Sequence, residues 1–227
     1  MEELKTFILR VFSIIVIAFI PCAGLLMVYF YTSPIIADYH EIKEKRAVLD
    51  VFSIPYRKTE KKIMGFTLKG FDKNDIRKVF DESITVEDKD ASGVKTEEER
   101  KVYKFTKGSE LQGIGFIRSK LGYGYNKSST MSLFICMEPD METLKGIEVL
   151  EHSETPGLGG RMTEDQFKGQ FAGMKLKPRI IMVKERKATG DNEFDAITGA
   201  TNTSRGIEAF INDAVHEFWG ESGELKW

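Results

Sequence analysis

A long uncharged stretch dominates the N-terminal part of the chain. Residues 11–37 contain no charged side chain, and their centre reads VFSIIVIAFIPCAGLLMVYFYT. A helix needs about 20 apolar residues to span a bilayer, whereas a cleaved signal peptide has an apolar region of only about 7–15 residues. Tyr29, Phe30 and Tyr31 at the end of the stretch are typical of a membrane interface. We therefore expect a retained, single transmembrane anchor, with residues 1–34 forming the N-terminal tail and the anchor.

The flanking charges do not orient this anchor. Lys5 and Arg10 precede it, and Lys43, Lys45 and Arg46 follow it. The side with more Lys and Arg normally stays in the cytoplasm. Because both flanks carry basic residues, this rule does not decide which side holds the rest of the chain.

The next segment has helical and irregular signals. Apolar residues recur at helical spacing over residues 35–52, so we expect a helix that ends before Pro55. Asp72 is placed to cap a short helix over residues 72–80. The polar stretch from Asp88 to Arg100 reads as a solvated loop. We therefore interpret residues 35–100 as a helical and irregular membrane-proximal region.

Alternating apolar positions begin at Val102 and predict a sheet. Two strands are expected around a turn at Lys107-Gly108-Ser109, two more at SLFICM and GIEVLE, and another at RIIMVK. Thr163 fits the start of a helix over TEDQFKGQFAG. The segment NTSRGIEAFINDAVHEFW has one apolar face and predicts an amphipathic C-terminal helix. Residues 101–227 therefore read as an α+β domain with a largely antiparallel sheet and flanking helices.

Composition narrows the functional classes. The chain has 227 residues, 30% of them charged, and a formal net charge of −2. Nucleic acid is not expected as a partner, because its binding requires a concentrated basic surface. Cys22 and Cys136 are too few for a disulfide framework. No CxxC motif or Cys/His cluster predicts a zinc or iron–sulfur site, so no metal is expected.

The first chemically suggestive motif is HSETPGLGG, over residues 152–160, directly after a predicted strand. Gly157 and Gly159 allow tight turns and close approach to a flat ligand. Glu154 and Thr155 offer polar groups beside the apolar Leu158. A planar ring could lie against this loop, although a plain strand-ending turn explains the same residues.

The second motif is DAITGATNTS, over residues 195–204, at the start of the C-terminal helix. A helix N-terminus presents free N–H groups and partial positive charge, which suits a phosphate. Gly199 and Ala200 remove bulk beside Thr201. Hydroxyl groups that can donate hydrogen bonds come from Thr198, Thr201, Thr203 and Ser204. N-capping explains one or two of these hydroxyls, and the rest favour a phosphate site.

Together, ETPGLG and TGATNTS resemble the FMN-binding domain of the G subunit of Rnf ion-translocating complexes and of the C subunit of sodium-pumping NADH:quinone reductases. Gly122-Tyr123-Gly124 resembles the glycine–aromatic element of that family. The resemblance covers roughly residues 122–218 and the anchor. Ala196 and Thr198 are mild departures, because glycine and serine are common at these positions in the family.

The resemblance implies that FMN is attached covalently, by a phosphoester to Thr201, and that a flavin transferase reads a motif opened by Asp195. It also implies that the flavin ring contacts the ETPGLG loop. The residues expected to bind the cofactor are Thr201, Glu154, Thr155, Gly157, Leu158, Gly159, Thr198, Gly199, Ala200, Thr203, Ser204 and Tyr123. Catalytic residues and independent catalytic activity are not expected.

The function implied is electron transfer within a membrane complex. The resemblance favours an Rnf G subunit, coupling electron transfer between ferredoxin and NAD⁺ to sodium or proton translocation. Its expected partners are the other membrane and peripheral Rnf subunits, the flavin transferase during maturation, and membrane lipid. The family places this domain on the non-cytoplasmic side of the cell membrane. Three alternatives remain open: a quinone reductase C subunit, a free-standing extracellular flavinylated reductase, and a non-redox membrane-anchored binding protein.

Overall fold

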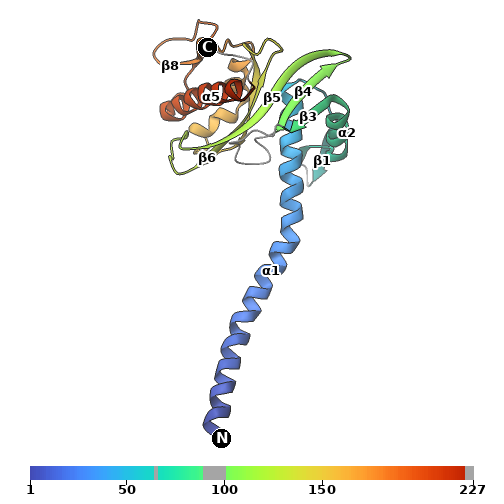
Figure 1. Cartoon of the computed structure of the whole chain (residues 1–227), viewed down its shortest axis with the longest axis vertical. Helices are drawn as coiled ribbons and strands as arrows, with labels where there is room; N and C mark the ends of the chain where they lie inside the picture. The colour runs from blue at the N-terminus through green and yellow to red at the C-terminus, as the bar shows by residue number, and fades with distance from the viewer. Residues whose placement is uncertain (64–65, 89–100, 223–227) are drawn as a thin grey trace. The chain divides into compact units, whose positions relative to one another are not determined.

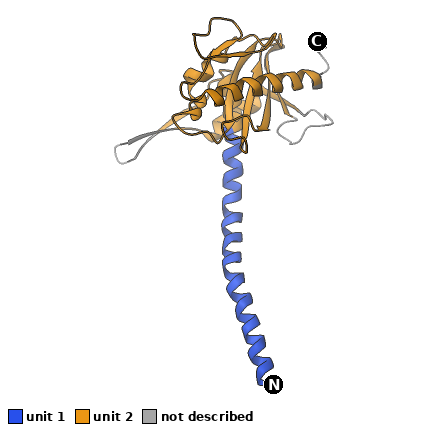
Figure 2. Cartoon of the chain, turned by 90° about the vertical axis from the view of Figure 1, so that its left-hand side faces the viewer, with its two compact units in different colours: residues 1–43 blue, residues 44–227 orange. Residues whose placement is uncertain are grey.

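The computed structural model describes residues 1–63, 66–88 and 101–222 (Figure 1). The chain divides into two compact units, residues 1–43 and 44–227 (Figure 2). This division lies nine residues beyond the expected end of the anchor at residue 34. We describe each unit by itself.

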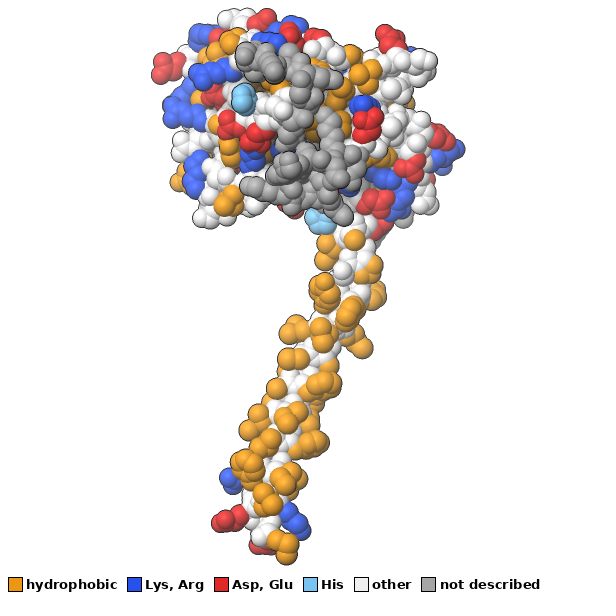
Figure 3. Space-filling model, in the orientation of Figure 1, with side chains coloured by type: hydrophobic (Ala, Val, Ile, Leu, Met, Phe, Trp, Pro, Cys, Tyr) orange, Lys and Arg blue, Asp and Glu red, His pale blue; other side chains and the backbone are white. Residues whose placement is uncertain are grey.

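The first unit is helical. It belongs to α1 (Glu2–Val51), whose most apolar 18-residue window has a mean hydropathy of 2.7. Large apolar side chains remain exposed along it, which Figure 3 shows as hydrophobic side chains on the helix surface. Pro21 and Pro34 lie inside α1 without ending it. Within the described residues, α1 is the one helix long and apolar enough to cross a membrane.

The second unit is built on a five-stranded sheet in which every pairing is antiparallel. The strand order is β3-β4-β5-β6-β7. The bounds are β3 Ile84–Asp88, β4 Lys101–Lys107, β5 Glu110–Leu121, β6 Thr130–Met137 and β7 Leu144–Glu151. The strands expected around Lys107-Gly108-Ser109 and at SLFICM and GIEVLE are thus confirmed. The α+β class with a largely antiparallel sheet is confirmed as well.

Helix α5 (Thr201–Ser222) provides the main core against this sheet. The predicted apolar face is buried, with Phe210, Ile211 and Ala214 each at 0% exposure. Phe218 of α5 stacks on Phe116 of β5, with ring centroids 4.2 Å apart and planes 3° from parallel. Because β7 leads into one motif and α5 begins at the other, this packing positions both motifs within one domain.

A cluster of aromatic side chains, some from the sheet and some from outside it, packs around Phe134 of β6. Phe134 is fully buried and lies edge-on to Tyr103, at 5.6 Å between centroids, and to Phe52, at 6.3 Å. Tyr103 in turn meets Phe80 of α2 (Lys73–Ser83) at 6.2 Å. β6 is buried along nearly its whole length, because alternate residues pack into the α5 core and into this aromatic cluster.

The capping prediction for α2 is confirmed. The Asp72 side chain accepts hydrogen bonds from the backbone N–H groups of Asn74, at 3.0 Å, and Asp75, at 3.3 Å. The preceding residues form a hairpin of β1 (Lys58–Ile63) and β2 (Phe66–Phe71) that the sequence pattern did not predict. The loop expected from Asp88 to Arg100 lies outside the described residues, apart from Asp88, which ends β3.

The helix expected to start at Thr163 differs in the structure. A 3-10 helix η1 (Gly159–Thr163) comes first, followed by a single turn, α4 (Asp165–Lys168), and a 3-10 helix η2 (Gly169–Phe171). Glu164, not Thr163, is the N-cap residue of α4. Phe171 is fully buried and lies 4.9 Å from the Phe194 ring. Burying these aromatic rings takes precedence over continuing a regular helix.

The strand expected at RIIMVK is short and pairs unexpectedly. It is β8 (Ile181–Val183), and it runs parallel to β9 (Glu193–Asp195) in a separate two-stranded sheet. Side-chain contacts hold the intervening loop. Arg186 contacts both carboxylate oxygens of Glu193, at 2.5 and 2.7 Å. β9 ends at Asp195 and so leads directly into the second motif.

Candidate functional site

The turn before α5 is fixed by the side chain of Ser204. Its Oγ accepts a hydrogen bond from the Ile197 N–H, at 2.9 Å, and donates one to the Ala200 carbonyl, at 3.0 Å. Ser204 is fully buried. Gly199 has a φ of +82°, a conformation that side chains rarely adopt. The chain is thereby turned so that Thr201 becomes the first residue of α5.

The loop after β7 closes by a tight turn at Thr155. The Thr155 carbonyl accepts hydrogen bonds from Leu158 N–H, at 3.2 Å, and Gly160 N–H, at 3.0 Å. Gly157, between Thr155 and Leu158, has a φ of +76°. Backbone hydrogen bonds alone hold this turn, so it does not depend on the Leu158 side chain. Leu158 is 48% exposed.

A cavity of about 600 Å³ joins this loop, the start of α5 and the segment after β5. Its volume is in the range of small-molecule sites, about 300–1,000 Å³. It is lined by most of the predicted residues, namely Glu154, Thr155, Leu158, Gly159, Gly199, Ala200, Thr201 and Thr203. The structure thus brings both sequence motifs to one place.

Tyr125, Asn126, Ser153 and Asn202 also line the cavity and were not predicted. Each lies within two residues of one that was singled out, so proximity in sequence was the available signal. Tyr125 is 72% exposed and adds an aromatic surface to the cavity. The cavity therefore combines aromatic and apolar groups, Tyr125 and Leu158, with hydroxyl and amide groups at the start of α5.

Four predicted cofactor residues are not among those lining the cavity: Gly157, Thr198, Ser204 and Tyr123. Gly157 and Ser204 shape the two turns. Thr198 is exposed beside a second cavity. The Tyr123 ring packs on Phe210 of α5, at 5.3 Å between centroids, and its hydroxyl donates to Asp213. Direct roles for these side chains in binding a cofactor remain predictions.

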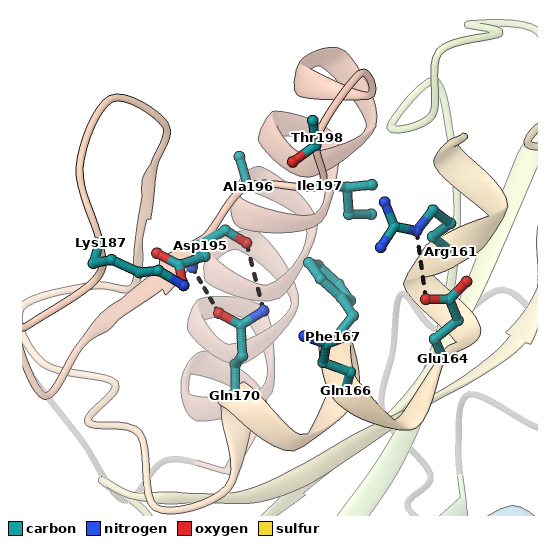
Figure 4. Close-up of a pocket in the computed structure, with 10 residues that line it drawn as sticks. All are labelled: Arg161, Glu164, Gln166, Phe167, Gln170, Lys187, Asp195, Ala196, Ile197 and Thr198. Atoms are coloured by element: carbon teal, nitrogen blue, oxygen red, sulfur yellow. Dashed lines mark hydrogen bonds and ion pairs between the residues drawn. The ribbon is translucent and has the colours of Figure 1, made fainter. Parts of the chain in front are cut away.

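The second cavity, of about 290 Å³, lies beside Asp195 (Figure 4). The side-chain amide of Gln170 bonds the Asp195 backbone, accepting from its N–H at 2.7 Å. The Asp195 carboxylate accepts from the Ala188 N–H, at 2.7 Å, and lies 3.5 Å from Lys187 Nζ. Arg161 and Glu164 form an ion pair at the opposite wall, at 3.4 Å. Asp195 is thus placed beside the second cavity and not in the cavity that contains Thr201.

The first cavity has the chemistry of an anion site next to a flat-ring site. An α-helix leaves its first N–H groups without intrahelical partners, and α5 starts at Thr201. Those N–H groups and the helix dipole favour a phosphate. Leu158 and Tyr125 provide exposed apolar and aromatic surface in the same cavity. The residues present therefore fit a ligand with a phosphate at one end and a planar ring at the other.

Comparison with known proteins gives an independent result. Residues 124–216 match the sequence model of the FMN-binding domain family. The chain is 36% identical over 108 residues to the C subunit of the Na⁺-translocating NADH-quinone reductase of Yersinia pestis, covering 44% of this chain and 39% of that protein. The corresponding protein of Vibrio vulnificus strain YJ016 is also 36% identical over 108 residues, covering 44% and 40%. The chain thus spans about two fifths of the length of these relatives.

Solved structures share the fold. NqrC of Shewanella oneidensis superposes with a TM-score of 0.54 at 20% identity, covering 78% of this chain and 89% of that chain. The Na⁺-translocating NADH-quinone reductase C subunit of Parabacteroides distasonis also superposes with a TM-score of 0.54, at 18% identity, with 70% and 87% covered. The two sequence relatives are C subunits, so they favour the alternative reading of the sequence over the Rnf G subunit. Residues 124–216, which hold both motifs and the cavity between them, are therefore similar to the FMN-binding domain found in C subunits of Na⁺-translocating NADH-quinone reductases.

Proposed function

We propose that this chain is an electron-carrying subunit of a membrane redox complex and holds one FMN through a phosphoester to Thr201. One observation carries the proposal: the Thr201 hydroxyl belongs to the first residue of α5, and Thr201 lines a cavity shared with the ETPGLG loop. The match of residues 124–216 to the FMN-binding domain family supports the choice of cofactor.

Different residues of the chain would bind the phosphate and the ring of FMN. The ester bond would join Thr201 Oγ1 to the phosphorus, and the free N–H groups at the start of α5 would face the phosphate oxygens. Leu158 and Tyr125 would contact the ring, because both are exposed in the cavity. When bound, FMN supplies the redox chemistry, and the protein supplies position and electrostatics.

The complex is proposed to be of the NADH-quinone reductase type. The relatives are C subunits of such complexes, which supports this reading over the Rnf reading. The remaining subunits of that complex would be the chain's partners. Helix α1 would anchor the chain in the membrane, with the second unit on the non-cytoplasmic side. Purification from native membranes in mild detergent, with identification of the co-purifying subunits, tests the type of complex. Protease access to sealed vesicles tests the side.

Asp195 is proposed to be read by the flavin transferase. Its carboxylate also holds the loop before β9 through Ala188. An Asp195→Asn variant keeps an oxygen for the Ala188 N–H, so we expect a folded chain that is flavinylated more slowly. An unchanged rate of flavin attachment would remove this role.

The central test is covalent attachment itself. The full chain is produced together with a flavin transferase, and flavin fluorescence is read after denaturing electrophoresis. We expect a fluorescent band that is lost in Thr201→Ala and retained in Thr106→Ala, which removes an exposed hydroxyl on β4, outside both motifs. Peptide mass spectrometry should place the added FMN on Thr201. A wild-type chain without bound flavin would overturn the proposal.

A further inference from the structure

The Glu154 carboxylate is a buried junction between three segments. Its Oε1 accepts a hydrogen bond from the Tyr125 backbone N–H, at 2.7 Å. Its Oε2 accepts one from the Thr203 hydroxyl, at 2.5 Å. Glu154 is 8% exposed and Thr203 is 2% exposed. One side chain therefore joins the loop after β7 to the segment after β5 and to the first turn of α5.

Two glycines pack closely against this carboxylate. A Cβ added at Gly124 would collide with Oε1, and one added at Gly159 would collide with Oε2 and with the Thr203 hydroxyl. Both glycines are buried. A side chain at either position would therefore require the Glu154 carboxylate to move.

The three segments that Glu154 joins are the walls of the first cavity. Tyr125, whose N–H it binds, supplies the exposed aromatic side chain of the cavity. Thr203 lies two residues beyond Thr201, on the first turn of α5. A carboxylate at this junction can thus set the separation between the Thr201 hydroxyl and the aromatic wall.

We propose that Glu154 is the positioning residue of the flavin site, acting through Thr203 and the Tyr125 backbone. This inference rests on the proposed function, because it concerns how the FMN attached to Thr201 is held. The sequence suggested Glu154 as a ring contact. The structure also gives each of its two carboxylate oxygens a hydrogen-bond donor within the protein. Glu154 therefore sets where Thr201 and the ring surface stand relative to each other.

Two variants separate the contacts of Glu154. Glu154→Ala removes both hydrogen bonds, and Thr203→Val removes one while keeping a buried side chain of similar shape. Each is made in the full chain and produced with the flavin transferase. We expect both variants to change the visible circular dichroism of the bound flavin, because the ring surface shifts relative to its attachment point. We also expect attachment to slow by on the order of 10-fold, since misplaced reacting groups lose rate steeply.

A conservative variant and a matched control exclude a merely structural effect. Glu154→Gln keeps an oxygen for Tyr125 N–H, and its amide N–H can donate to the Thr203 hydroxyl oxygen, which reverses that hydrogen bond but keeps the link, so the variant should show the wild-type flavin dichroism. Asp140 is the control because it also accepts from a threonine hydroxyl, at 2.6 Å from Thr143, and from backbone N–H groups, at 3.0 Å. It lies at the opposite end of β7 from Glu154. Asp140→Ala should lower the melting temperature and leave the flavin dichroism unchanged.

The outcomes separate this inference from the proposed function. A wild-type chain without covalent flavin overturns the proposed function. A flavinylated wild type whose dichroism and attachment rate persist in both Glu154→Ala and Thr203→Val overturns the positioning role alone. Changed dichroism in those two variants, with recovery in Glu154→Gln, supports it.

Discussion

The hydroxyl of Tyr123 donates a hydrogen bond to Oδ2 of Asp213 on α5, at a distance of 2.5 Å. The same tyrosine ring lies 5.3 Å from the Phe210 ring, between centroids. Tyr123 therefore attaches the segment after β5 to α5, whereas its near neighbour Tyr125 lines the first cavity. Burial, followed by the hydrogen bond to Asp213, raises the pKa of Tyr123 from 10.0 to about 12.

This raised pKa predicts a loss of stability at alkaline pH. Below about pH 10 the phenol is protonated in both the folded and the unfolded chain. Between pH 10 and 12 the unfolded chain releases its proton first, so stability falls as the pH rises through this window. We expect the urea midpoint of the wild type to fall more steeply across this window than that of Tyr123→Phe. Phenolate absorbance, compared between the two proteins, locates the titration directly. Parallel pH profiles would contradict the assignment.

We expect Gly206→Ala to destabilise the protein, although Gly206 lies inside helix α5. Alanine is intrinsically better than glycine in a helix by about 0.8–1.0 kcal/mol. At Gly206, however, a Cβ would collide with the backbone carbonyl of Tyr123. Overpacking of this kind typically costs about 1–3 kcal/mol. We therefore expect Gly206→Ala to lower the free energy of unfolding, measured by urea titration of the full chain in detergent.

Gly220 provides the matched control for this prediction. It lies on the same helix, and a Cβ added there would have no atom of the described residues within 4 Å. Gly220→Ala should stabilise the chain by up to about 1 kcal/mol, because only helix propensity acts. The same sign of change in both variants would show that the contact with Tyr123 does not limit the packing of α5.

We expect the Ser204 hydroxyl, which holds the turn before α5, to contribute to the free energy of unfolding. Ser204→Ala leaves the Ile197 N–H without its acceptor, in a place where Ile197 itself is 5% exposed. An unsatisfied buried donor costs about 1–3 kcal/mol. We expect a loss of that size in the free energy of unfolding. Thr198→Ala, at an exposed position of the same motif, should change it by less than about 0.5 kcal/mol. Equal effects would contradict the role of the Ser204 hydroxyl.

Asp72 predicts a capping contribution to α2. Asp72→Ala removes the acceptor for the N–H groups of Asn74 and Asp75. Loss of such a cap costs about 0.5–2 kcal/mol. The free energy of unfolding should fall by this amount, whereas Glu82→Gln should have little effect. Glu82 belongs to an exposed pair with Lys78, at 3.9 Å, and such pairs contribute about 0–1 kcal/mol.

Local sequence patterns were sufficient to predict most of the regular helices and strands. The uncharged run over residues 11–37 is confirmed as part of α1, and the alternation from Val102 is confirmed as β4 to β7. The apolar face of α5 and the cap at Asp72 are confirmed too. These predictions succeeded because side-chain periodicity and capping act between residues a few positions apart.

Other elements depended on contacts that no local pattern contains. The helix expected from Thr163 is reduced to one turn because Phe167 and Phe171 pack against Phe194. The β8–β9 pair joins strands separated by a loop that Arg186 and Glu193 hold through their side chains. Such contacts are satisfied only once the chain has folded.

The sequence by itself predicted that two motifs carry the chemistry, and it placed Thr201 at the start of an amphipathic helix, where the structure has it. Only the tertiary structure decided that both motifs line one cavity and that Tyr125 lines it where Tyr123 does not. It also decided that Glu154 bonds Thr203, 49 residues away along the chain. The physical reason is that motifs record which groups are present, whereas buried hydrogen bonds and close contacts between distant segments determine where those groups point.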